Sequence, residues 1–216
     1  MDHNDGGDPV ARKVFVGEPL SKLILYVLTG APHPYGWNEH AVRAALCRRE
    51  ILALLVRYWF GARLRLPRTA GWAWNQTHLA YEMSVEFIDG CHVPLRCSMD
   101  PEAADAFDEL VHRIMRPLQG HLIEAGFDGQ VWQAGLGNPT GAANFMLESG
   151  SAPEWRWVWV DLESGVPALF PINPLALLRF YLPRSVRHGQ CLFDDVDVPK
   201  LRRYIEEHRI LIGHRL

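Results

Sequence analysis

Hydrophobic and polar residues follow two different periods along this chain, and together they predict a mixture of strands and helices. Apolar side chains occupy every second position over residues 79–87, which predicts a strand with one buried and one exposed face. Residues 10–16 form a shorter strand candidate, and the apolar run at residues 20–28 predicts another strand or a buried segment. Residues 155–161 predict a further strand, in which tryptophans at alternate positions pack on one face.

The first predicted helix covers residues 39–60. Asn38 is its N-cap candidate, and Gly61 supplies the residue type that commonly ends a helix. Two further helices are expected in the second half of the chain.

The second helix opens at residues 100–102, where an aspartate cap is followed by a proline and a glutamate. Pro117 is expected to kink this helix, and Gly126 to end it. The third helix covers residues 199–209 and is capped by Asp197.

One charged residue stands out in the first helix. Glu50 is four residues from both Leu46 and Leu54, so helical spacing predicts that its carboxylate lies on an apolar stripe. A buried carboxylate needs a cationic partner, because leaving it unpaired costs several kcal/mol. The partner is either a distant cation or a neighbouring arginine, Arg49 or Arg57.

Composition is that of an ordinary globular protein. The chain has 216 residues, of which 48% are hydrophobic and 22% charged, enough for one full core or two small lobes. Its longest apolar run is far shorter than the ~20 residues that cross a bilayer, so no membrane span is expected. The acidic first residues lack the basic and apolar regions of a secretory signal, which favours a cytoplasmic location.

Charge and cysteine content give no support for nucleic-acid binding or for a zinc site. A formal net charge of −3, without a run of Lys or Arg, gives no general attraction for nucleic acid. The four cysteines form no CxxC pair. In a reducing compartment such cysteines are mostly small buried hydrophobic side chains. A metal site made of Cys91, His92 and Cys97 is disfavoured because no fourth ligand follows at zinc-like spacing.

The most informative motif lies at residues 137–161. Asn144 precedes a short apolar segment, a break rich in Gly and Pro follows at residues 150–153, and the next strand candidate ends at Asp161. Amide and carboxylate oxygens are hard ligands of the kind that Mg²⁺ prefers. Asn144 and Asp161 are therefore candidate magnesium ligands.

Three further motifs precede this one in a definite order. They are Val-Ala-Arg-Lys ending at Lys13, Arg-Arg-Glu ending at Glu50, and Glu-Phe-Ile-Asp-Gly beginning at Glu86. Val-Asp-Leu-Glu follows around Asp161. With these motifs in this order, residues 10–161 resemble the protein-kinase-like superfamily, particularly atypical and small-molecule members such as the aminoglycoside and choline phosphotransferases.

The resemblance implies a fold as well as a site. The expected fold is α+β and two-lobed, with a truncated N-terminal lobe over residues 1–89 and a mainly helical C-terminal lobe over residues 90–216. Only twelve residues precede Lys13, fewer than the usual glycine-rich hairpin needs.

The implied cofactors are ATP and Mg²⁺, and each motif has a role toward them. Lys13 would bind phosphate, with Glu50 as its ion-pair partner. The backbone at Glu86 and Ile88 would receive the adenine ring. Asn144 and Asp161 would bind the metal, and the phosphate acceptor would be an unidentified small molecule or protein.

The catalytic loop departs from the family pattern. The residue five before Asn144, where the family carries its aspartate base, is Pro139, and Asn138 stands beside it as the candidate catalytic residue. An amide cannot accept the substrate proton, and a general base is typically worth about 10²- to 10⁴-fold in rate. Both an active phosphotransferase and a nucleotide-binding pseudokinase are therefore compatible with the sequence.

Two other functions fit parts of the sequence. Gly135, Gly137 and Gly141 could form a phosphate-binding turn after a strand at residues 130–134, with Asp161 on a ribose, as in NAD(P)-binding enzymes. That fold needs a helix directly after Gly141 and repeated βα units, for which the chain has little room. The other alternative is a non-catalytic scaffold that binds a partner protein and in which the glycines form a structural loop.

Overall fold

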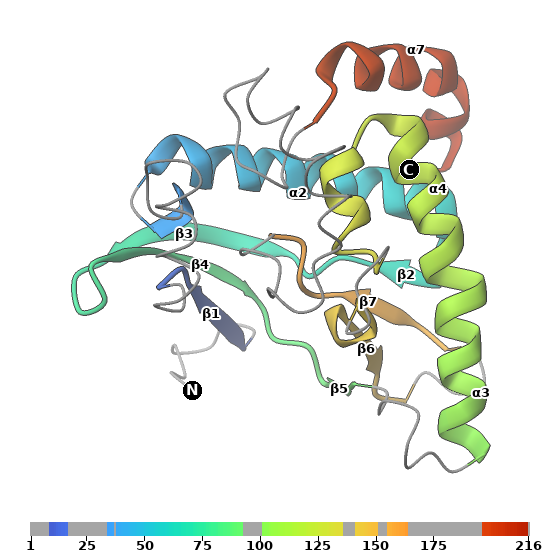
Figure 1. The fold of residues 1–216 in the computed structure, drawn as a ribbon, viewed down its shortest axis with the longest axis horizontal. Coiled ribbons are helices and arrows are strands. Elements are labelled where there is room, and N and C mark those ends of the chain that lie inside the picture. Colours follow the sequence, from blue (N-terminus) through green and yellow to red (C-terminus); the bar gives the residue numbers. More distant parts are fainter. Residues whose placement is uncertain are drawn as a thin grey trace, which may run out of the picture.

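The fold combines two β-sheets with several helices (Figure 1). The structure is a computed structural model that describes residues 9–16, 34–36, 38–92, 101–135, 141–150, 155–163 and 196–215. The predicted α+β class is confirmed. The segment 20–28, for which a strand or buried segment was predicted, lies outside the described residues.

The first sheet is antiparallel and has the strand order β1-β4-β3. Its strands are β1 (Val10–Val14), β3 (Thr69–Asn75) and β4 (Ala80–Glu86). The strand predicted at residues 79–87 is therefore present but shorter by one residue at each end. Leu79 belongs instead to the β3–β4 turn, where its φ is 48° and its side chain is exposed.

Helix α2 (Glu39–Phe60) has the predicted bounds because both of its ends are set by local capping. Oδ1 of Asn38 accepts a hydrogen bond from the backbone N–H of His40 at 3.0 Å. Gly61, with φ of 61°, donates its N–H to the carbonyl of Arg57 at 2.9 Å. Figure 1 shows α2 extending from the first sheet to the C-terminal helix.

The second sheet has the order β2-β7-β6-β5. Its strands are β2 (Leu64–Arg65), β5 (Gly90–Cys91), β6 (Phe145–Glu148) and β7 (Trp157–Trp159). β6 and β7 pair in antiparallel fashion, whereas β2 pairs with β7 in parallel. All three residues of β7 are fully buried, so this strand is covered on both faces.

The long helical segment after residue 100 contains a π-helical stretch just before Pro117. It consists of α3 (Pro101–Glu109), a π-helical stretch η3 (Leu110–Met115) and α4 (Arg116–Ala125). Pro117 lies in the first turn of α4 and has no N–H to donate to the preceding π-helical turn. Gly126, with φ of 85°, ends α4 in the left-handed conformation.

The remaining helical segments are short except for the last. They are η1 (Pro34–Gly36), η4 (Asp128–Val131), η5 (Gly141–Asn144) and α7 (Val198–Arg215). Asp197 caps α7 as predicted, since its Oδ1 accepts from the N–H of Lys200 at 3.1 Å. The described helices include none with the length and apolar composition of a membrane span.

Two hydrophobic clusters form the interior, and α2 contributes to both. The smaller cluster joins the first sheet to the N-terminal half of α2 and contains Tyr35, Val42, Ala45 and Met83. The larger cluster joins the C-terminal half of α2 to β6, β7, α4 and α7. The predicted division into two lobes at residue 89 stays a prediction. Helix α2 and strand β2, which both precede residue 89, pack into the larger cluster.

Candidate functional site

Four charged side chains from distant parts of the chain meet after the end of β7. Lys13 lies on β1, Arg49 on α2, and Asp161 and Glu163 follow β7. Nζ of Lys13 donates to Oδ1 of Asp161 and, at 2.9 Å, to Oε2 of Glu163. Arg49 donates to Glu163 through Nε and, at 3.1 Å, through Nη2. We call these four residues the charged cluster; its two cations balance its two anions.

Glu163 is the buried centre of the charged cluster. Its side chain is 2% exposed and that of Arg49 3% exposed. Burial alone would raise the pKa of Glu163, but attraction to Lys13 and Arg49, with the hydrogen bonds from both, holds this pKa well below its ordinary value. Glu163 is therefore ionised at neutral pH and fixes the positions of both cations.

Lys13 and Asp161 form the accessible side of the charged cluster, with side chains 31% and 45% exposed. Burial lowers the pKa of Lys13, but the charges of Glu163 and Asp161 outweigh this effect and raise the pKa above its ordinary value. Lys13 therefore stays cationic at physiological pH. An incoming anion and a metal ion can reach this pair more readily than they can reach Glu163.

Arg49 also supports the backbone that carries Asp161. Its Nη2 lies 3.4 Å from the carbonyl oxygen of Val160, the residue before Asp161. Nη1 of Arg49 is buried and has no hydrogen-bond partner among the described residues. The guanidinium group thus orients both the Glu163 side chain and the end of the strand.

Asn144 lies beside Asp161 because β6 and β7 pair in antiparallel fashion. The carbonyl of Asn144 accepts from the N–H of Val160 at 2.9 Å and from that of Asp161 at 3.5 Å. Nδ2 of Asn144 donates to the carbonyl of Gln133 at 2.7 Å and to its side-chain Oε1 at 3.0 Å. Since Gln133 engages the nitrogen, Oδ1 is the amide atom that remains to coordinate a metal ion.

The donor set of Asn144 and Asp161 suits Mg²⁺. One amide oxygen and one carboxylate match a metal that usually keeps several waters and is completed by substrate phosphates. The described ranges contain no group of three or more His, Cys, Asp or Glu side chains arranged to hold a metal ion. Cys91 is an exposed free thiol, and Cys97 of the disfavoured metal site lies outside those ranges.

Residues 87–89, within the motif that begins at Glu86, connect β4 of the first sheet to β5 of the second. Glu86, the last residue of β4, donates its N–H to the carbonyl of Arg68 at 2.8 Å. Its carboxylate accepts two hydrogen bonds from Arg65, at 2.9 and 3.0 Å. Ile88 is 7% exposed within this connection. Both the backbone N–H and the carboxylate of Glu86 are therefore engaged within the protein.

The expected pair between Lys13 and Glu50 is not formed, and this prediction is wrong. Glu50 is exposed on α2, and no salt bridge joins it to Lys13, Arg49 or Arg57, all of which the structure describes. The stripe that carries Glu50 faces outward, since Leu54 on it is 51% exposed.

The buried face of α2 includes Val42, Ala45, Arg49, Leu52 and Val56. Arg49 is thus a charged residue that α2 directs inward, one position before the predicted one. It continues an apolar stripe at helical spacing, which is the signal that identifies it. Glu163 is the last residue of the Val-Asp-Leu-Glu motif, and the sequence alone predicts no role for it.

Two other predictions meet the described structure differently. The NAD(P)-binding alternative required a strand at residues 130–134 and a helix after Gly141. The structure has η4 and a turn over residues 128–135, and the short η5 followed by β6 from Gly141 onward, so neither of these two elements is formed there. Asn138 lies outside the described residues.

The chain matches no protein family, no curated protein and no solved structure.

Proposed function

We propose that this chain is a kinase-like protein that binds ATP together with Mg²⁺. The observation that carries the proposal is the contact between Lys13 and Asp161, next to Asn144. Residues separated by 148 positions meet here, and they are the cation and the two oxygen ligands that a nucleoside triphosphate with its metal requires.

In this proposal the direct contact between Lys13 and Asp161 is replaced by contacts to the nucleotide and its metal ion. The ammonium group of Lys13 would pair with phosphate oxygens, and a carboxylate oxygen of Asp161 and Oδ1 of Asn144 would hold Mg²⁺, which would neutralise phosphate charge. Lys13 keeps its second bond, to Glu163, and is therefore held in position during the exchange.

Glu163 and Arg49 supply the orientation that Glu50 was expected to give. A phosphate-binding lysine needs a carboxylate to hold it, and here that carboxylate comes from the segment after β7 instead of from α2. Helix α2 contributes the cation that holds the carboxylate. The predicted arrangement had the carboxylate on α2, whereas in the structure α2 supplies a cation and the segment after β7 supplies the carboxylate.

Catalysis is a separate question from binding. If the protein transfers phosphate, the acceptor is a small molecule or a protein, and a proton acceptor other than the amide of Asn138 must serve. If it does not, it is a nucleotide-binding pseudokinase. The alternative function is a scaffold that binds a partner protein without a nucleotide.

A thermal-shift experiment tests nucleotide binding. Wild type, Asp161→Asn and the control Asp108→Asn, at an exposed position of α3, are melted with and without ATP, with and without Mg²⁺. A ligand that binds only the native state at a hundredfold excess over Kd stabilises it by ~2.7 kcal/mol. The ligand-induced shift is compared within each variant, because Asp161→Asn also removes an ion pair.

We expect an ATP shift that needs Mg²⁺ in wild type and in Asp108→Asn, and its loss in Asp161→Asn. The absence of any shift with ATP in wild type would contradict the proposal and favour the scaffold. Release of ADP from the same samples, through transfer of the γ-phosphate to water or to the protein itself, would identify an active enzyme.

A further inference from the structure

Two glycines meet next to the proposed metal ligand Asn144. Gly135 ends the turn that follows η4, and Gly141 is the first residue of η5. A β-carbon on Gly141 would overlap Cα of Gly135 and lie 3.2 Å from its backbone nitrogen, so a larger residue forces the two backbones apart. We call this backbone approach the glycine contact. Residues 136–140, between its two members, lie outside the described ranges.

The glycine contact lies between Asn144 and its hydrogen-bond partner. Gln133 is two residues before Gly135, and Asn144 is three residues after Gly141. Nδ2 of Asn144 donates to the backbone carbonyl of Gln133 at 2.7 Å and to its side-chain Oε1 at 3.0 Å. The separation of the two glycine backbones therefore determines how near Gln133 lies to the amide of Asn144.

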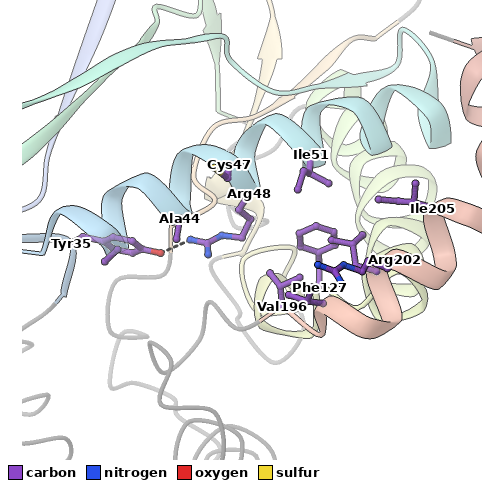
Figure 2. A pocket seen from close by; sticks show the side chains of 12 residues that line it. Tyr35, Ala44, Cys47, Arg48, Ile51, Phe127, Val196, Arg202 and Ile205 are labelled. Atoms are coloured by element: carbon purple, nitrogen blue, oxygen red, sulfur yellow. Dashed lines mark hydrogen bonds between the residues drawn. The ribbon is translucent and has the colours of Figure 1, made fainter.

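The segment that carries Gln133, residues 127–135, is fixed at both ends. Phe127 is fully buried, and Figure 2 shows its ring in the wall of a cavity that α2 and the start of α7 also line. Near the other end, the carbonyl of Ala134 accepts from Nε2 of Gln119 on α4 at 2.9 Å. This segment cannot move as a whole to make room for a larger residue in the glycine contact.

The segment that carries Asn144 is fixed as well. Ala142 and Phe145 are buried in the larger hydrophobic cluster. The carbonyl of Asn144 accepts from the N–H of Val160 at 2.9 Å, which holds the backbone of Asn144 against β7. Because both segments are held, a larger residue in the glycine contact has to change the contact between Gln133 and the Asn144 side chain.

We propose that Gly135 and Gly141 are positioning residues for the metal ion, acting through Asn144. The glycine contact keeps Gln133 on Nδ2 of Asn144, and these hydrogen bonds leave Oδ1 with a fixed direction as the ligand atom. This inference rests on the proposed function, in which Asn144 holds Mg²⁺. Loss of a group that orients a metal ligand typically costs about ten- to a hundredfold in metal affinity.

Isothermal titration calorimetry of the full chain with ATP in the presence of Mg²⁺ tests the proposal. The test variant is Gly141→Ala. The matched control is Gly120→Ala, at an exposed position of α4 where a β-carbon meets no atom within 4 Å. We expect Gly141→Ala to raise the Kd of ATP by about tenfold or more. Gly120→Ala should bind within about twofold of wild type.

A double-mutant cycle distinguishes positioning from a general packing defect. Asn144→Ala removes the ligand itself, so adding Gly141→Ala to it should change the Kd of ATP by less than about twofold. A packing defect that reaches the nucleotide by another route would cost the same factor with and without Asn144. Thermal unfolding without ligand shows whether each variant is folded at the temperature of the titration.

Gln119→Ala is a second variant that keeps the proposal testable if Gly141→Ala does not fold. It removes the hydrogen bond to the carbonyl of Ala134 and adds no atom to the glycine contact. It should weaken ATP binding in Mg²⁺ by about threefold or more, the factor expected for one hydrogen bond. This loss should also disappear in the Asn144→Ala background.

Two results would overturn the positioning role and leave nucleotide binding intact. One is a folded Gly141→Ala, or in its place Gln119→Ala, that binds ATP within about twofold of wild type. The other is a loss of equal size with and without Asn144. A wild type that binds no ATP in Mg²⁺, or an Asn144→Ala variant that binds as tightly as wild type, would instead contradict the proposed site itself and the positioning role with it.

Discussion

Replacing Arg49 with Met tests whether the charged cluster is a buried network on which the native state depends. The substitution keeps most of the side-chain volume but removes the donors to Glu163 and to the carbonyl of Val160. Glu163, 2% exposed, would then keep Lys13 as its one cationic partner from the charged cluster. Removing one partner of a buried ion pair typically costs about 3–5 kcal/mol, because the other charge stays buried without full compensation.

For a chain of this length each kcal/mol lowers Tm by about 2–4 °C, so Arg49→Met is expected to lower Tm by about 6–20 °C. Urea denaturation followed by circular dichroism gives the free energy of unfolding directly. The control is Arg57→Met, at an exposed position of the same helix, which is expected to change stability by less than about 0.5 kcal/mol.

A double-mutant cycle separates the interaction from other effects of the substitution. Glu163→Gln removes the charge that Arg49→Met leaves uncompensated, so the double variant should be destabilised by less than the sum of the single changes. The reasoning is refuted if Arg49→Met costs less than about 1 kcal/mol, or if the two changes are additive.

Three other predictions concern the same fold and site. The pKa of Glu163 is lowered on folding, so the stability that its ionised side chain contributes is complete above its unfolded pKa of about 4.3 and declines as pH falls below that value. Urea titrations of wild type and Glu163→Gln should therefore give a difference in unfolding free energy that shrinks below that pH. A constant difference would contradict the ionised state of Glu163 in the native protein. Gln133→Ala removes the side-chain acceptor of the Asn144 amide and keeps the backbone acceptor, so it should reduce the Mg²⁺-dependent ATP shift with little change in Tm; an unchanged shift would show that the Gln133 side chain plays no part in orienting Asn144. Gly126→Ala forces a β-carbon to 2.8 Å from the carbonyl oxygen of Asp197 at a φ of 85°, so unfolding should become easier by more than about 1 kcal/mol, and a stabilised variant would contradict this reading of the turn.

Features set by local chemistry could be predicted from the sequence. The bounds of α2 follow from a side-chain cap at Asn38 and a glycine with positive φ at residue 61, both of which act within one turn. The hairpin of β6 and β7 follows from two short apolar segments around a turn, and it carries Asn144 to Asp161. The first of these predictions needed no knowledge of the rest of the chain.

The buried charges could not be assigned in the same way. Glu50 and its neighbour Arg49 differ by about 100° on the helix, and tertiary packing decides which of them faces inward. Arg49 is buried because Glu163, 114 residues later, meets it there. Glu163 itself has no local signal, since its two partners lie on β1 and α2.

The most direct test of nucleotide binding is the affinity for ATP measured by isothermal titration calorimetry with and without Mg²⁺. Wild type is compared with Lys13→Met and with the matched control Lys200→Met on α7, each below its own melting temperature. A charged hydrogen bond contributes about 1.5–3 kcal/mol, so Lys13→Met should weaken binding by about ten- to a hundredfold while Lys200→Met binds like wild type. Equal affinities in the two variants, or a wild type that binds no ATP in the presence of Mg²⁺, would contradict the account.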